Sequence, residues 1–202
     1  LGPEHFRDAL RAGLAMGADN AIHLMDRAFD LVDSLTAARL LANTVAFIGF
    51  DLILCGRQAV DDDMGQIGPA LAVYLDIPCV TVVTQLEFAD DWKMVKVSRQ
   101  IEGGYEIIES PLPSLFTCQK GLNQPRLPSF KGIMAAKKKE IQIFDAEKIG
   151  FVPNMVRDKI STTLQTGLAL PLPRDKGVLF DGPTNEAISK LVKTLRETEK
   201  VV

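Results

Sequence analysis

The chain has 202 residues, 47% hydrophobic and 24% charged, an ordinary composition for a folded protein with one sizeable domain. Its formal net charge of −3 argues against a nucleic-acid-binding protein, which needs a strongly positive face. No apolar run is long enough to cross a membrane and we find no signal-peptide pattern, so we expect neither a membrane span nor secretion.

Cysteine and histidine usage points away from catalysis. Three cysteines at wide spacing (Cys55, Cys79 and Cys118) predict buried thiols in a reducing compartment, the cytoplasm or, in a eukaryote, the mitochondrial matrix. His5 and His23 stand in no partner pattern. We therefore expect no catalytic residue and no metal site.

The first third of the chain alternates between helical and strand patterns. In chain order, the expected elements are a helix from Pro3 to Gly17, a strand over 20–25, a helix over 34–47, a strand over 52–55 and a helix from Ile67. This alternation predicts a parallel sheet with helices against it.

The stretch from Phe50 to Asp76 places a polar loop between the last of these strands and its helix. Ligands in open α/β sheets sit at the carboxyl ends of strands, and helix N-termini attract anions. Residues 56–68 are therefore expected to hold a nucleotide or another anionic ligand, although neither GxxxxGK[ST] nor GxGxxG is present.

Three adjacent carboxylates in this loop, Asp61, Asp62 and Asp63, look unsuited to phosphate. One interpretation makes them helix-start residues, with Asp63 as the N-cap. A metal site would need converging ligands from elsewhere in the sequence, and none is visible.

The remaining elements begin with an antiparallel insertion and end in an arm. We expect strands over 79–88, 93–101, 105–109, 115–118 and 140–144, an extended arm over 151–180 and a final helix over 181–199. Between the last two strands, an exposed loop over 119–132 precedes a helical turn that starts near Ile133. Lys137–Lys139 are expected on a solvated face. Phe130 in this loop either packs against its own domain or contacts a partner.

Three stretches together resemble the beta subunit of electron transfer flavoproteins. They are GRQAVDDDMGQIGP (56–69), KVSRQIEGG (96–104) and LNQPRLPSFKGIMAAKKKE (122–140). The resemblance is collinear to about residue 149. It implies a Rossmann-like, adenine-nucleotide-binding α/β domain over 1–149, without the family's first strand, helix and strand, and a C-terminal arm and helix over 150–202 that pack on a partner subunit.

The resemblance also implies cofactors and partners. The partner alpha subunit would carry FAD, and an acyl-CoA dehydrogenase or another soluble flavin dehydrogenase would donate electrons. In this subunit the loop would wrap AMP, with backbone amides and Gln66 reaching the phosphate. The implied cofactor-binding residues are Gly56, Arg57, Gln58, Ala59, Val60, Asp61, Asp62, Asp63, Met64, Gly65, Gln66 and Ile67. The implied partner-docking residues are Pro128, Phe130, Lys131, Ile133 and Met134.

The family divides at this loop. Ordinary members resemble DDD and hold AMP, whereas electron-bifurcating members resemble DGD and hold a second FAD in the same place. Asp62 at the middle position favours AMP, because a carboxylate adds bulk and charge where a second phosphate would lie. Arg57 and Gly68–Pro69 resemble the bifurcating members. Gln100 replaces an acidic residue that many members place near the partner's flavin.

Two other classes of protein share this general pattern. A nucleotide-hydrolysing or adenylyl-transferring domain would need a phosphate-loop lysine, a catalytic histidine or a metal set, and the sequence offers none of them. A nucleotide-sensing domain would not require the antiparallel insertion or the docking-like loop. The sequence therefore favours an electron carrier subunit that performs no covalent chemistry itself.

Overall fold

The computed structural model describes residues 1–30, 32–152, 161–163, 166–173 and 176–201. It divides into two compact units, Leu1–Gln165 and Thr166–Val202. The second unit consists of extended chain followed by helix α6 (Thr184–Lys193) and the π-helical turn η4 (Thr194–Thr198). The final helix that the sequence predicts is therefore present. Much of the arm predicted over 151–180, namely residues 153–160, 164–165 and 174–175, lies outside the described residues.

The first unit alternates helices and strands as expected. Its helical elements are η1 (Glu4–Phe6), α1 (Arg7–Ala15), η2 (Arg27–Phe29), α2 (Ser34–Ile48), α3 (Ile67–Leu75) and α4 (Phe130–Lys138). Its strands are β1 (Ile22–Leu24), β2 (Leu52–Gly56), β3 (Cys79–Phe88), β4 (Met94–Ile101), β5 (Gly104–Pro111), β6 (Ser114–Cys118) and β7 (Gln142–Phe144).

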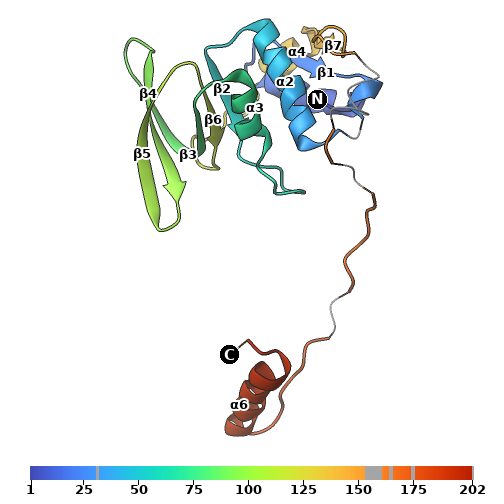
Figure 1. The fold of residues 1–202 in the computed structure, drawn as a ribbon, viewed down its shortest axis with the longest axis vertical. Helices are drawn as coiled ribbons and strands as arrows, with labels where there is room; N and C mark the ends of the chain where they lie inside the picture. Colours follow the sequence, from blue (N-terminus) through green and yellow to red (C-terminus); the bar gives the residue numbers. More distant parts are fainter. Residues whose placement is uncertain (31, 153–160, 164–165, 174–175, 202) are drawn as a thin grey trace. The chain divides into compact units, whose positions relative to one another are not determined.

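Parallel pairing dominates near the helices, and antiparallel pairing builds the insertion (Figure 1). The larger sheet has the order β2-β6-β3-β4-β5. In it, β6 runs parallel to both β2 and β3, and β4 pairs antiparallel with β3 and β5. The smaller sheet is the parallel pair β1-β7. The predicted Rossmann-like α/β fold with an antiparallel insertion is confirmed.

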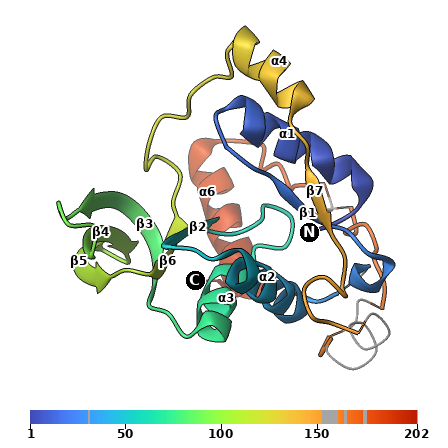
Figure 2. The same cartoon turned by 90° about the horizontal axis from the view of Figure 1, so that it is seen from above.

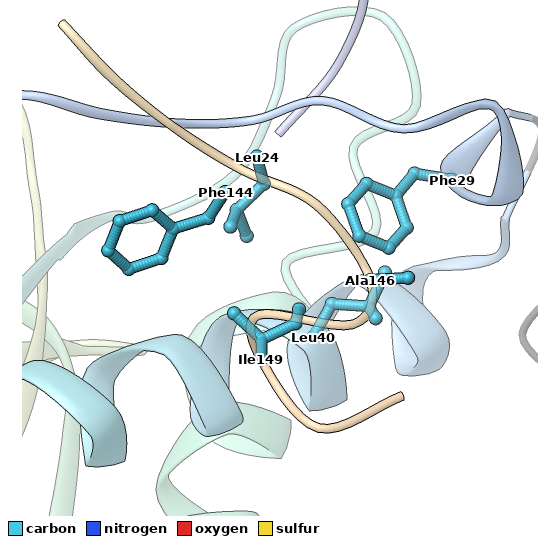
Figure 3. Close-up of a cluster of buried hydrophobic side chains, with 6 residues drawn as sticks. All are labelled: Leu24, Phe29, Leu40, Phe144, Ala146 and Ile149. Atoms are coloured by element: carbon cyan, nitrogen blue, oxygen red, sulfur yellow. The ribbon is translucent and has the colours of Figure 1, made fainter. Parts of the chain in front are cut away.

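Helix α2 links the two sheets through its side chains. Leu40 belongs to a buried cluster with Leu24 of β1 and Phe144 of β7, which Figure 3 shows. Ala42 belongs to a second cluster with Ile53 of β2 and Leu71 of α3. Burying both sides of one amphipathic helix supplies apolar stabilisation to both sheets at once.

The helix in the docking-like segment begins earlier than the sequence predicts. Helix α4 starts at Phe130, not near Ile133, because the Ser129 hydroxyl caps it by accepting a hydrogen bond from the Gly132 amide at 3.0 Å. Phe130 therefore lies on the first turn of a helix and not in a loop.

The start of α2 also anchors a distant segment. One carboxylate oxygen of Asp33 accepts the Thr36 amide at 2.8 Å as an N-cap. The other accepts the amides of Thr162 at 2.7 Å and Thr163 at 2.9 Å, and both threonine hydroxyls. Although partial burial opposes it, the hydrogen bonds from Thr36 and Thr162 hold the pKa of Asp33 well below its usual range. The anionic carboxylate thereby fixes residues 161–163 to the start of α2.

We predict that Asp33→Ala lowers the free energy of unfolding of the chain in urea by about 1–2 kcal/mol, because it removes both the cap and the anchor. Since the folded-state pKa is depressed, this stabilisation is complete above the ordinary carboxyl pKa of about 4 and is lost as the pH falls below it. The difference between wild type and Asp33→Ala should therefore shrink on acidification. Asp30→Ala, an exposed carboxylate in the same loop, is the control. An equal loss in the control would contradict this role.

Candidate functional site

A cavity of about 390 Å³ lies at the carboxyl end of β2, next to the start of α3. It is lined by Ser34, Cys55, Gly56, Arg57, Gln58, Ala59, Asp62, Met64, Gly65, Gln66, Ile67 and Gly68. The strand supplies one wall, the connecting loop the second, and the first residues of α3 the third. A ligand pocket at the carboxyl end of a parallel strand is the arrangement expected for an α/β sheet.

Helix α3 approaches β6 closely at Gly68, one of the residues that line the cavity. A Cβ placed on Gly68 would lie 2.5 Å from Cγ2 of Thr117, which is closer than two non-bonded carbon atoms approach one another. Thr117 is itself held in place, since its Oγ1 accepts the Val82 amide at 3.0 Å and its side chain is buried. Glycine at position 68 therefore fixes where α3 begins relative to the sheet.

The first turn of α3 leaves its donors free for a ligand. Gln66 is the N-cap, and it makes no side-chain capping hydrogen bond. The amides of Ile67 and Gly68 have no partner within the helix, whereas Pro69 has no amide hydrogen and the Ala70 amide donates to the Gln66 carbonyl. The helix dipole adds partial positive charge there. Because Gln66, Ile67 and Gly68 line the cavity, these properties favour an anionic group such as a phosphate.

The three carboxylates of the loop accept hydrogen bonds from other groups of the same loop. Asp61 accepts the Asp62 amide at 3.0 Å, and Asp62 accepts the Met64 amide at 3.1 Å. Asp63 has a left-handed backbone with φ of 56° and accepts a hydrogen bond from the Gln58 side chain. The interpretation of Asp63 as the N-cap of the helix is wrong, because α3 begins at Ile67 and its N-cap is Gln66, three residues after Asp63.

The structure separates the expected cofactor-binding residues into two groups. Val60, Asp61 and Asp63 do not line the cavity, and the Val60 side chain is 99% exposed. The other nine positions between Gly56 and Ile67 named above do line it. Among the cavity-lining residues, Arg57 is the cation and Asp62 is the anion. Arg57 donates to the Gln119 side chain at 3.3 Å, which directs it toward the end of β6.

Sequence reasoning missed Ser34, the first residue of α2. It lines the cavity, and its hydroxyl lies 3.6 Å from the Met64 sulfur. No local pattern marks this residue, because only the packing of α2 beside α3 brings it to the loop. Asp33 could have indicated where α2 begins, because aspartate commonly caps helices. It could not have indicated that Ser34, the next residue, lines the cavity.

Burial makes the cysteine that lines the cavity a weak nucleophile. Cys55 lines the cavity and is half-buried; burial, and then the nearby Cys118 and Cys79, raise the pKa of its thiol. It is therefore protonated at neutral pH and weakly reactive. The prediction of buried thiols is wrong for Cys79, which is exposed at the first position of β3. Within the described ranges, no three His, Cys, Asp or Glu side chains gather to hold a metal.

A second feature is the exposed apolar end of α4. The Phe130 side chain is 80% exposed, and Ile133 and Met134 on the next turn are also exposed. Pro128 and Lys131 flank Phe130 on the surface. Of the two alternatives for Phe130, packing against its own domain is wrong for the described part of the chain.

The comparisons with known proteins agree on one family. The family model described as electron transfer flavoprotein domain matches residues 1–149. The chain is 42% identical over 96% of its length to the electron transfer flavoprotein subunit beta of Thermoanaerobacterium thermosaccharolyticum, covering 75% of that protein. It is 41% identical over 98% of its length to subunit CarD of the caffeyl-CoA reductase–Etf complex of Acetobacterium woodii, covering 75% of it.

A mammalian protein shows similarity of the same extent. The electron transfer flavoprotein subunit beta of Sus scrofa is 39% identical over 99% of this chain, which covers 74% of that protein. In the described residues, no helix is both long and apolar enough to cross a membrane. On the match of the family model and of these relatives over nearly the whole sequence, the chain belongs to the electron transfer flavoprotein family, among its beta subunits.

Proposed function

We propose that this electron transfer flavoprotein subunit binds AMP in the cavity between β2 and α3 and docks a soluble flavin dehydrogenase through α4. Electrons would pass from that dehydrogenase, for example an acyl-CoA dehydrogenase, to FAD carried by the alpha subunit. The chain itself would make and break no covalent bond. The observation that carries the proposal is the cavity at the uncapped start of α3.

The size and charge of the cavity support a mononucleotide. Its volume of about 390 Å³ is near the lower end of the range of about 300–1,000 Å³ for small-molecule pockets. The free amides at the start of α3 suit one phosphate group. Asp62 opposes a second phosphate, since its carboxylate lies on the cavity wall and is held there by the Met64 amide.

The alternative occupant is a second FAD in the same place, as in the electron-bifurcating members that the loop also resembles. In its favour, CarD, a relative at 41% identity, is a subunit of a caffeyl-CoA reductase–Etf complex. Arg57, which lines the cavity, would neutralise one additional phosphate. The nucleotide released from the purified complex distinguishes the two occupants.

The alpha subunit would cover apolar surface that this chain leaves exposed. Within the second unit, Ile188, Leu191 and Val192 follow the spacing of one helical face on α6 and are exposed. A helix of ten residues is marginal in water without a packing partner. We therefore propose that residues 150–202 pack on the alpha subunit.

The first prediction for this function concerns nucleotide content. The chain purified with its alpha subunit, then denatured, should release one FAD and one AMP per heterodimer, quantified by chromatography of the supernatant. Two FAD and no AMP per heterodimer would instead indicate that the cavity holds a second FAD, as in the electron-bifurcating members. No adenine nucleotide beyond one FAD would show that the cavity does not hold one.

The second prediction concerns docking. Phe130→Ala should leave nucleotide content unchanged and should weaken binding to the dehydrogenase by about 2 kcal/mol, because it removes an exposed aromatic anchor. The measurement is the rate of flavin reduction against dehydrogenase concentration. Tyr105→Ala is the control, because Tyr105 is an aromatic residue 67% exposed on β5, outside α4. A lowered melting temperature with unchanged dehydrogenase coupling in Phe130→Ala would contradict the docking role.

A further inference from the structure

Helix α4 lies directly beside α1, at a very small separation (Figure 2). A Cβ on Gly132 would lie 2.5 Å from the carbonyl oxygen of Ala15, so only glycine allows the two backbones to approach this closely. Leu14 of α1 and Ala136 of α4 are also buried in one hydrophobic cluster, together with Ile141. The faces of the two helices that meet are thus fully packed, while Phe130 is left outside.

Two basic side chains link α1 and α4. One extends from α1 to the end of α4, and the other extends from the end of α4 to the segment just after α1. Arg11 of α1 donates from one guanidinium nitrogen to the carbonyl oxygens of Ala136 and Lys139 at the C-terminal end of α4. In return, the Lys139 ammonium donates to the carbonyl oxygens of Ala18 at 2.8 Å and Asp19 at 3.1 Å, just after α1. We call these two residues the Arg11–Lys139 clamp.

The clamp adds hydrogen bonds from charged donors to carbonyl oxygens at the end of α4 and just after α1. The Ala136 oxygen also accepts the Lys139 amide at 3.3 Å, and positive charge near the C-terminal end of a helix is favourable. Hydrogen bonds from a charged donor contribute more than neutral ones. Lys139 is half-buried, unlike Lys137 and Lys138, so the expectation of a solvated face fails for one lysine of the three.

This support matters because α4 is short. A helix of nine residues has little stability of its own and depends on tertiary contacts. If α4 were disordered before docking, the partner would have to supply the free energy of ordering it. A fixed α4 presents Phe130 in one place and removes that cost.

Building on the proposed docking role of α4, we infer that Arg11 and Lys139 are positioning residues for dehydrogenase docking. They hold α4 in a preformed arrangement without touching the partner themselves. Their loss should raise the dehydrogenase concentration needed for half-maximal flavin reduction and leave the maximal rate unchanged. This division separates positioning from any effect on electron transfer itself.

The test uses the purified heterodimer and a purified short-chain acyl-CoA dehydrogenase as the probe. Arg11→Ala should remove hydrogen-exchange protection from the amides of residues 133–138 and raise the half-saturating dehydrogenase concentration on the order of tenfold. Arg11→Lys should restore part of both. Arg7→Ala is the control, since Arg7 is on the same helix and only reaches Glu4 at 3.7 Å on the surface. FAD and AMP content should match wild type throughout.

If Arg11→Ala impairs assembly, Lys139→Ala tests the same clamp from the other side. Unchanged protection in both variants would overturn the clamp. Lost protection with an unchanged half-saturating concentration would overturn its role in docking. Phe130→Ala, measured in parallel, separates this inference from the proposed function: if it also leaves the half-saturating concentration unchanged, α4 is not the docking surface at all.

Discussion

The contact between Gly68 and Thr117 determines where the candidate site can form. No side chain larger than hydrogen fits at position 68, because a Cβ there would lie 2.5 Å from a methyl group of Thr117. Thr117 belongs to β6, the strand between β2 and β3. By placing the first turn of α3 against β6, next to β2, this contact brings the uncapped helix start to the end of β2, where the cavity is. A larger residue would displace α3 and with it one wall of the cavity.

Different helices support the two parts of the proposed function. Helix α2 packs on both sheets, supplies Ser34 to the cavity, and anchors residues 161–163 through Asp33. Helix α1 fixes α4 through Arg11. Loops that bind ligands or partners work best when a rigid scaffold positions them. The proposed nucleotide loop and the proposed docking helix are therefore held by different helices, so each can be altered separately by mutation.

Local patterns predicted the elements well, and contacts between distant segments explain the errors. The strand at Cys79–Phe88 has the predicted bounds, because β-branched residues and flanking turns mark it clearly. The start of α4 was missed by three residues, since the cap at Ser129 outweighs the weak periodicity around it. Ser34 was missed because its place beside Met64 depends on how two helices pack. The sequence also predicted the loop at 56–67 as the ligand site. Which of its residues line the cavity depends on hydrogen bonds that Asp61 and Asp62 accept from amides within the loop, and the sequence does not show these.

Photoaffinity labelling with 8-azido-AMP tests most directly whether the cavity between β2 and α3 holds the nucleotide. The heterodimer would be stripped of AMP, labelled, digested and mapped by mass spectrometry, with unlabelled AMP as competitor. The account predicts label on peptides that contain residues 56–68 or the start of α2, and its loss when AMP is present. Label confined to the alpha subunit, or to parts of this chain distant from the cavity, would contradict it.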